Sequence, residues 1–172
     1  MIIRITEERD IPAVLALYED ARAFMRENGN GGQWGDRYPS EEDLRKDMQA
    51  GASYVCVDER GESGAPAGTV VGTFAYFYGE DPDPNYVEIR DGAWPDRLPY
   101  GVVHRITTLR GTHGVAVYCL DWAYGRCHHL RIDTHRKNIP MQNLVRKCGF
   151  EYCGIVRMIE SDGTDRDAFM KV

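Results

Sequence analysis

The apolar residues of this chain recur with two different periods, and each period predicts a different kind of element. Residues 2–6 alternate between apolar and polar, which is typical of a strand with one buried face. From residue 11 onward the apolar residues recur every three or four positions, which predicts a helix. The residues on its buried face are Ile11, Val14, Leu15, Tyr18, Ala21 and Met25. Asp10 offers a capping oxygen, Pro12 suits the first turn, and the glycine-rich run 28–32 ends the helix.

Further helices and strands follow along the chain. Ser40 followed by three acidic residues is typical of a helix start, and this helix should end near Gln49. Runs rich in β-branched and aromatic residues predict strands at 53–59, 69–79, 101–108, 130–135, 152–160 and 165–172. Two more helices are expected at 114–127 and 139–148.

Two connecting segments have their own signals. Residues 80–99 carry Asp-Pro twice and Trp94-Pro95, which predicts an irregular excursion. The turn Ser161-Asp162-Gly163-Thr164 holds an Asp-Gly pair between two strand-like runs, and this pair favours a hairpin. The predicted order is therefore β-α-α-β-β-β-α-β-α-β-β. This order indicates an α/β (mixed α+β) fold, with helices on the faces of a mixed sheet, in a single domain over 1–172.

Composition and charge exclude several classes of protein. The 172 residues are 42% hydrophobic and 28% charged, so the chain can bury a core and is not disordered. Because no apolar run approaches the roughly 20 residues that a membrane helix needs, we expect no membrane partner. The net charge of −6, without a long basic run, argues against nucleic acid as the main partner. The N-terminus becomes polar too early for a signal peptide, so we expect a cytoplasmic protein.

The five cysteines fit free thiols better than a disulfide framework, because their number is odd and nothing marks secretion. The run Cys127-His128-His129 leaves a zinc site open as the alternative. Since no Cys-x-x-Cys spacing accompanies it, we predict no metal.

The segment from Arg110 to Ala116 is the strongest functional signal. It is a glycine-bearing turn between a predicted strand and a predicted helix. The first N–H groups of a helix lack partners and carry the positive end of its dipole, so such a turn can hold a phosphate. A plain strand-to-helix connection is the alternative.

In this context the chain resembles the GNAT superfamily of acyl-CoA-dependent N-acyltransferases. That family carries Gln/Arg-x-x-Gly-x-Gly/Ala at the turn, and Gly114-Val115-Ala116 matches its second half. Gly111 stands where Gln or Arg is usual, with Arg110 one residue earlier. An Asn that opens the next helix and a Gly-Phe that closes it are matched by Asn138 and Gly149-Phe150.

The resemblance implies a GNAT fold and acetyl-CoA as cosubstrate. The diphosphate would lie on the backbone of the turn, and the pantetheine arm would pair with the strand before it. The cofactor-binding residues implied are Ile106, Thr107, Thr108, Arg110, Gly111, Thr112, His113, Gly114, Val115, Ala116 and Asn138.

Acyl transfer to an amine needs a base, and we select His104, in the strand before the turn. An imidazole titrates at about pH 6.5 in reference peptides, and some members of the family carry a strand histidine that takes part in proton transfer. A hydrogen-bonded strand histidine without chemistry is the alternative. His135 is a second candidate, or it orients the Asn138 loop. Val145 occupies the position where the family often carries a tyrosine that protonates the leaving thiolate, so the general acid is missing or moved.

The loop between the first two helices walls the acceptor site in similar proteins. Here it holds Trp34, Asp36 and Tyr38, with both aromatics expected at the surface. The aromatics suit an amine, and Asp36 could hold its charge. In the alternative, Trp34 and Tyr38 only cap the core.

We therefore expect an N-acetyltransferase that acts on a primary amine of a small molecule or peptide. An acyl-CoA-binding sensing module with little turnover is the alternative. The sequence identifies neither the acceptor nor the oligomeric state, and a homodimer is left open.

Overall fold

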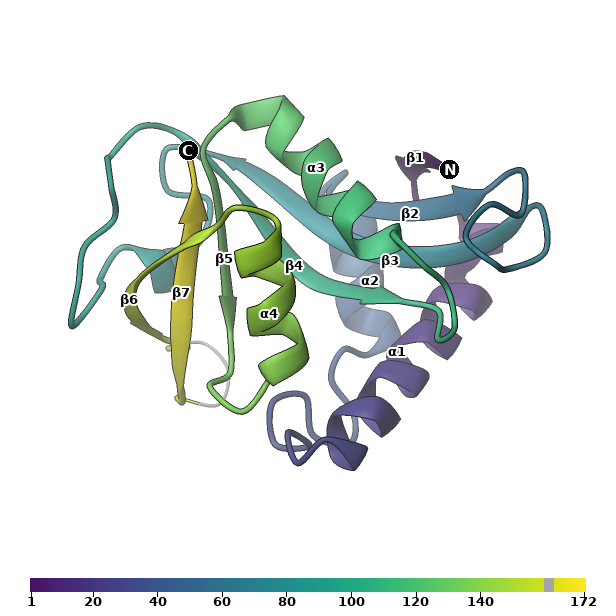
Figure 1. Ribbon diagram of the computed structural model, residues 1–172, viewed down its shortest axis with the longest axis horizontal. Helices are drawn as coiled ribbons and strands as arrows, with labels where there is room; N and C mark the ends of the chain where they lie inside the picture. The colour runs from purple at the N-terminus through teal and green to yellow at the C-terminus, as the bar shows by residue number, and fades with distance from the viewer. Residues whose placement is uncertain (160–162) are drawn as a thin grey trace. The chain divides into compact units, whose positions relative to one another are not determined.

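The computed structural model describes residues 1–159 and 163–172, and within them the chain builds seven strands and four α-helices (Figure 1). The strands are β1 Ile2–Ile5, β2 Ser53–Asp58, β3 Thr69–Gly79, β4 Tyr100–Thr108, β5 Leu130–Thr134, β6 Glu151–Arg157 and β7 Asp165–Lys171. The α-helices are α1 Ile11–Glu27, α2 Glu41–Gln49, α3 Val115–Cys127 and α4 Ile139–Lys147. Short 3₁₀ helices cover Glu8–Asp10 (η1) and Pro84–Tyr86 (η2).

The sheet is mixed. Its strand order is β1-β2-β3-β4-β5-β7-β6. The β1–β2, β2–β3, β5–β7 and β6–β7 pairs are antiparallel, whereas β4 and β5 pair in parallel. The predicted α/β class with a mixed sheet is confirmed.

The chain forms two compact units. The first comprises Met1–Tyr76 and His104–Trp122, and the second comprises Phe77–Val103 and Ala123–Val172. The elements β3, β4 and α3 each begin in one unit and end in the other. A single domain over 1–172 stays a prediction.

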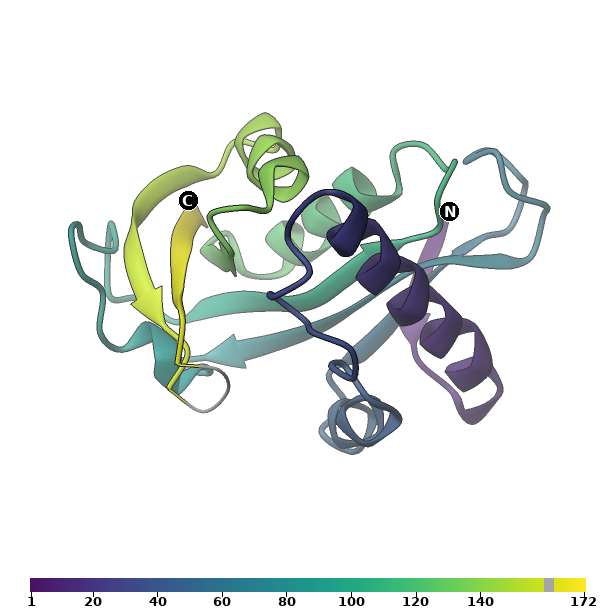
Figure 2. The same ribbon diagram turned by 90° about the horizontal axis from the view of Figure 1, so that it is seen from below.

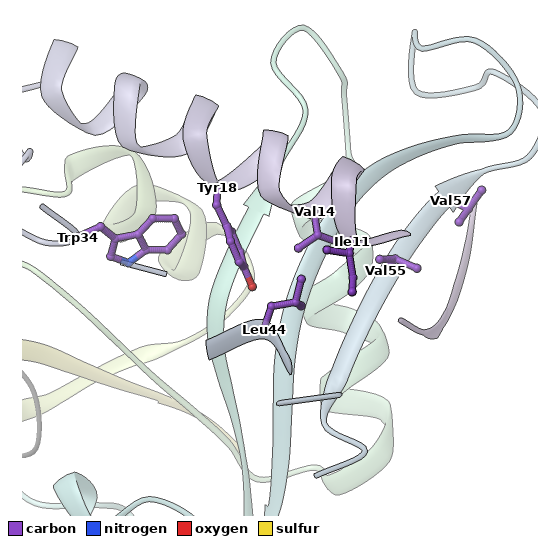
Figure 3. Packing of buried hydrophobic residues seen from close by; sticks show 7 residues of the cluster. All are labelled: Ile11, Val14, Tyr18, Trp34, Leu44, Val55 and Val57. Atoms are coloured by element: carbon purple, nitrogen blue, oxygen red, sulfur yellow. The ribbon is translucent and has the colours of Figure 1, made fainter. Parts of the chain in front are cut away.

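The core of the first unit lies between α1, α2 and β2 (Figure 3). The predicted face of α1 is confirmed: Ile11, Val14 and Tyr18 are buried, and the rest of that face is partly buried against them. Leu44 from α2 meets this face together with Val55 from β2.

The other face of β2 and β3 receives α3. Cys56 of β2 lies beside Cys119 of α3, and the interaction between the two thiols lowers the pKa of Cys56. A Cβ on Gly72 would lie 2.9 Å from Val115 Cγ1, so only glycine lets α3 approach β3 this closely. Since successive strand residues face opposite ways, Val55 packs under α1 while Cys56 packs under α3. Helices therefore cover both faces of the sheet in this unit.

The starts of α1 and α2 are stabilised in different ways. At α2, Ser40 Oγ accepts the Asp43 N–H at 3.2 Å, and Asp43 Oδ2 accepts the Ser40 N–H at 2.8 Å, as the sequence predicts. The prediction that Asp10 caps α1 is wrong, although α1 begins where expected. The Asp10 carboxylate instead accepts two bonds from Arg4, at 2.6 and 2.8 Å, and the Glu7 N–H at 2.8 Å, so it stabilises the preceding helix η1.

The second unit contains β5–β7, α4 and residues 80–99. β6 and β7 pair from Glu151 to Arg157, which confirms the hairpin, while Ser161 and Asp162 of its predicted turn lie outside the described residues. Residues 80–99 are irregular, as predicted, apart from η2. Arg90 joins this excursion to β6 through two backbone bonds with Ile155, at 2.9 and 2.8 Å.

The α4 helix begins and ends as the sequence predicts. Asn138 Oδ1 accepts the Met141 N–H at 3.3 Å, which caps the first turn. Gly149 has φ +84°, and the Phe150 N–H reaches the Val145 carbonyl at 3.0 Å. This left-handed ending requires glycine and explains the Gly-Phe pair.

Among residues 1–159 and 163–172, no helix has both the length and the apolar character that a bilayer crossing requires. All five cysteines are free, as predicted. The described residues hold no group of three His, Cys, Asp or Glu side chains placed for a metal, and His129 Nδ1 instead lies 3.0 Å from Asp96 Oδ2.

Candidate active site

The turn before α3 has the backbone that its glycines predict. Gly111 has φ +80° and Gly114 has φ +74°, in the left-handed region that side chains disfavour. A Cβ on either glycine would meet no atom within 4 Å, so the space beside the turn is open.

The amides of the turn divide into two groups. The Thr112 N–H donates to the Leu109 carbonyl at 3.3 Å, and the His113 N–H donates to the Ser63 carbonyl at 3.0 Å. The Tyr118 N–H donates to the Gly114 carbonyl at 2.9 Å. The N–H groups between Gly114 and Tyr118 form the second group. Because they precede the first intrahelical bond of α3, they can receive an anion. The Thr112 and His113 amides are thus used within the turn and its neighbouring loop, whereas the amides at the start of α3 are the ones open to a ligand.

Arg110 is directed toward α1. Its Nε lies 2.9 Å from Asp20 Oδ1 and its Nη1 lies 2.9 Å from Glu27 Oε2. The guanidinium also lies over the Phe24 ring, 5.3 Å from the centroid. Two carboxylates of α1 therefore already balance this charge.

The strand before the turn holds the other expected CoA contacts. Ile106, Thr107 and Thr108 are half-buried at the end of β4. The Leu109 N–H donates to the Val71 carbonyl at 2.8 Å, which ties the end of this strand to β3.

A buried ion pair lies next to His104, and the sequence analysis missed it. Arg105 donates to both Asp47 oxygens, at 2.8 and 2.6 Å, and its Nη1 donates to the Tyr38 hydroxyl at 2.9 Å. The exposed fractions of the two charged side chains are only 14% for Arg105 and 8% for Asp47. Arg105 also has φ +54°, a left-handed residue within β4. Burial raises the pKa of Asp47, while the charge and the hydrogen bonds of Arg105 act in the opposite direction.

His104 belongs to this cluster. It is half-buried in β4, and it is close enough to Asp47 for the electrostatic interaction between them to lower the pKa of that carboxyl. The structure therefore brings His104 and Tyr38, two residues chosen from the sequence, together with Arg105 and Asp47, which were not. A signal for Asp47 exists: it follows Leu44 by three residues, so both lie on the buried face of α2.

The acceptor loop differs from its prediction (Figure 2 follows it from α1 to α2). Trp34 is not at the surface: its exposed fraction is 9%, and its ring packs edge-on against Tyr18 with centroids 6.0 Å apart. The expectation was wrong because Tyr18 extends from α1 far enough to cover the indole (Figure 3). Tyr38 is 39% exposed, and its ring packs edge-on against Trp34, with ring centroids 6.2 Å apart. Asp36 is 91% exposed, and its carboxylate lies 3.7 Å from Arg26 Nη1 rather than against Arg105.

In the second unit, His135 and Asn138 form a local turn. His135 Nδ1 accepts the Lys137 N–H at 3.1 Å, and the His135 carbonyl accepts the Asn138 N–H at 2.8 Å. This arrangement favours the alternative in which His135 orients the Asn138 loop. Val145, at the position where a tyrosine is usual in the family, is fully buried in α4. The nearest tyrosine along the chain, Tyr152, packs edge-on against Phe169, with ring centroids 5.7 Å apart.

Comparison with solved structures shows the family of the chain. No protein-family model and no curated protein sequence matches it. Among solved structures, a GNAT-family acetyltransferase from Streptococcus agalactiae is 30% identical, with a TM-score of 0.83 over 99% of this chain and 94% of that one. A ribosomal-protein-alanine N-acetyltransferase from Brucella melitensis is 21% identical, with a TM-score of 0.61 over 100% and 99% of the two chains. A chain of the NatC complex bound to Gag peptide and CoA is 16% identical, with a TM-score of 0.60 over 99% and 96%.

The fold is that of an acyltransferase that uses a CoA thioester. The chain belongs to the GNAT superfamily of N-acyltransferases, as the sequence predicted. As a member of this family, it is an enzyme that transfers an acyl group from a CoA-type cosubstrate to an amine.

Proposed function

We propose that this enzyme transfers the acetyl group of acetyl-CoA directly to a primary amine of a small molecule or peptide. The observation that carries the proposal is the turn before α3, where Gly111 and Gly114 adopt positive φ beside open space. A diphosphate needs several backbone donors without side-chain bulk, and the first turn of α3 supplies them. Asn138 is retained as a cofactor contact by resemblance alone.

The chain has little covalent chemistry to supply, because the thioester is already activated. His104 takes one proton from the acceptor ammonium, so that the free amine can attack the thioester carbonyl carbon. A nitrogen–carbon bond forms, and the attacking nitrogen gives up its second proton to water. The carbon–sulfur bond then breaks, and the sulfur leaves as the thiolate of CoA. His104 then passes its proton to bulk water. Because the sulfur leaves as a thiolate, this route requires no general acid. It therefore fits a chain that has Val145 in place of the usual tyrosine.

Arg105 and Asp47 hold the region around His104. Their bidentate pair joins α2 to β4 and positions the Tyr38 hydroxyl. Tyr38, half-exposed, forms the aromatic wall of the acceptor site, with Trp34 as its buried support. Asp36 and His135 remain predicted acceptor contacts.

The decisive experiment incubates the purified enzyme with acetyl-CoA and a panel of amines and measures free CoA. The panel contains polyamines, aminoglycosides, aromatic amines, amino acids and peptides with free N-termini. Release of CoA that depends on one amine class supports the proposal. Tight acetyl-CoA binding by calorimetry without amine-dependent release would instead support the sensing module.

A further inference from the structure

Asp58 is a buried carboxylate whose environment goes beyond what an ordinary turn needs. It ends β2 and has an exposed fraction of 0%. Its Oδ1 accepts the N–H groups of Arg60, Gly61 and Glu62 at 3.3, 2.9 and 3.1 Å. Its Oδ2 accepts the Ser63 N–H at 2.7 Å and the Ser63 hydroxyl at 2.6 Å. These bonds, led by the Ser63 hydroxyl, hold the pKa of Asp58 well below its usual range.

The carboxylate thereby determines where Ser63 lies. Ser63 is 1% exposed and donates to Asp58 through both its backbone and its side chain. Its carbonyl in turn accepts the His113 N–H at 3.0 Å. His113 directly precedes Gly114, so the position of Ser63 is transmitted to the start of α3.

A second contact joins the same two loops. Gly64 has φ +98°, and a Cβ built on it would lie 3.6 Å from the Gly111 carbonyl oxygen. Residues 63 and 64 therefore lie along both ends of the run 111–113 (Figure 2 shows the β2–β3 loop beside the turn before α3). All of these residues belong to the first unit.

We propose that Asp58 is a positioning residue for the diphosphate of the CoA thioester, acting through Ser63 and the His113 amide. This inference rests on the proposed function, because it assumes that the diphosphate binds at the start of α3. The amide of an asparagine cannot replace the carboxylate, since its NH₂ group would face at least one of the N–H and O–H donors around Asp58. The β2–β3 loop must then shift, and the turn before α3 loses its support.

The test compares Asp58→Asn with Asp10→Asn. Asp10 is also a buried carboxylate of the first unit, but its partners are Arg4 and the Glu7 amide, so its loss costs stability without reaching the turn. Asp58→Asn is expected to raise the Kd for CoA about tenfold, the size of effect typical for a lost bond to a charged group. Asp10→Asn is expected to leave that Kd unchanged. An unchanged Kd in Asp58→Asn overturns the proposal.

A truncated donor separates positioning from general damage. S-acetylpantetheine lacks the diphosphate, so Asp58→Asn should lower kcat/KM for acetyl-CoA while leaving kcat/KM for S-acetylpantetheine at the parent value. An equal loss for both donors would show a merely structural role and overturn the inference.

Two further measurements keep the outcome decisive. Ser63→Ala removes only the hydroxyl bond, and it should raise the Kd for CoA in the same direction by roughly threefold. If this variant folds and binds CoA like the parent, the relay through Ser63 is wrong, even where Asp58→Asn fails to fold.

Hydrogen exchange of the His113 amide, followed by NMR without ligand, should accelerate in both variants. If exchange accelerates in both variants but the parent protein itself does not bind CoA, the relay stands and the proposed function is overturned instead.

Discussion

The turn before α3 and the loop between α1 and α2 are the segments that we propose to bind the cosubstrate and the acceptor, and they are built differently. The turn depends on backbone: Gly111 and Gly114 supply its conformation, and helix N–H groups supply its donors. The acceptor loop depends on side chains: Trp34 is buried against Tyr18, and Tyr38 is bonded to Arg105. The comparison teaches that substitutions in the turn should change cosubstrate affinity, whereas substitutions near the loop should change turnover or stability.

The largest effect is expected at His104. His104→Gln should lower amine-dependent turnover by roughly 10²- to 10⁴-fold, because a positioned general base contributes about that much. Affinity for acetyl-CoA should barely change. The measurement is the pH–rate profile, whose acid limb should disappear in the variant. His128→Asn, at an exposed histidine beyond α3, is the control and should keep the parent profile. A variant at 104 with an unaltered profile would remove His104 from the mechanism.

Trp34→Ala should affect stability before kinetics. Removing a buried indole is expected to lower the free energy of unfolding by about 3–5 kcal/mol, since the cavity beneath Tyr38 cannot close fully. Denaturant unfolding measures this loss. The acetyl-CoA KM should stay near the parent value, while the amine KM should rise because Tyr38 loses its support. A stable variant with only a raised amine KM would mean that Trp34 contacts the acceptor directly.

Gly114→Glu tests the backbone half of the comparison. The carboxylate would stand where the diphosphate is expected, so the Kd for CoA should rise roughly tenfold or more. Calorimetry provides the measurement. Gly51→Glu is the matched control, because Gly51 also has positive φ, +66°, with no atom within 4 Å of a built Cβ. Equal CoA affinity in the two variants would place the diphosphate elsewhere.

The smallest effect is expected at Arg110. Because Asp20 and Glu27 already balance its guanidinium at an exposed position, Arg110→Ala should change CoA affinity by less than roughly threefold. Loss of affinity well beyond that, measured in the same calorimetric series, would show that Arg110 leaves α1 to pair with a phosphate.

The sequence predicted the elements well because local signals dominate them. Ser40, Asn138 and Gly149 act through bonds within one turn of the chain, so their types and spacing suffice. Asp10 shows the limit: its residue type predicts a cap, but Arg4 lies within reach and takes the carboxylate.

The candidate site was only partly predictable for the same reason. Gly111 and Gly114 are recognisable from sequence, since few other residues accept their backbone. The burial of Trp34 and the pairing of Asp47 with Arg105 join residues that are distant in sequence, and no local pattern encodes them. The carbonyl of Ser63 that supports the turn is a backbone group, so its residue type gives no signal at all.

The left-handed backbone at Arg105 has a consequence for how this sequence can diverge. Glycine or asparagine would adopt φ +54° at lower cost, but either would leave Asp47 buried without its cation. A change at position 47 alone would strand the guanidinium in the same way. Neither position can therefore drift by single steps, and homologous enzymes should change positions 47 and 105 together or keep both.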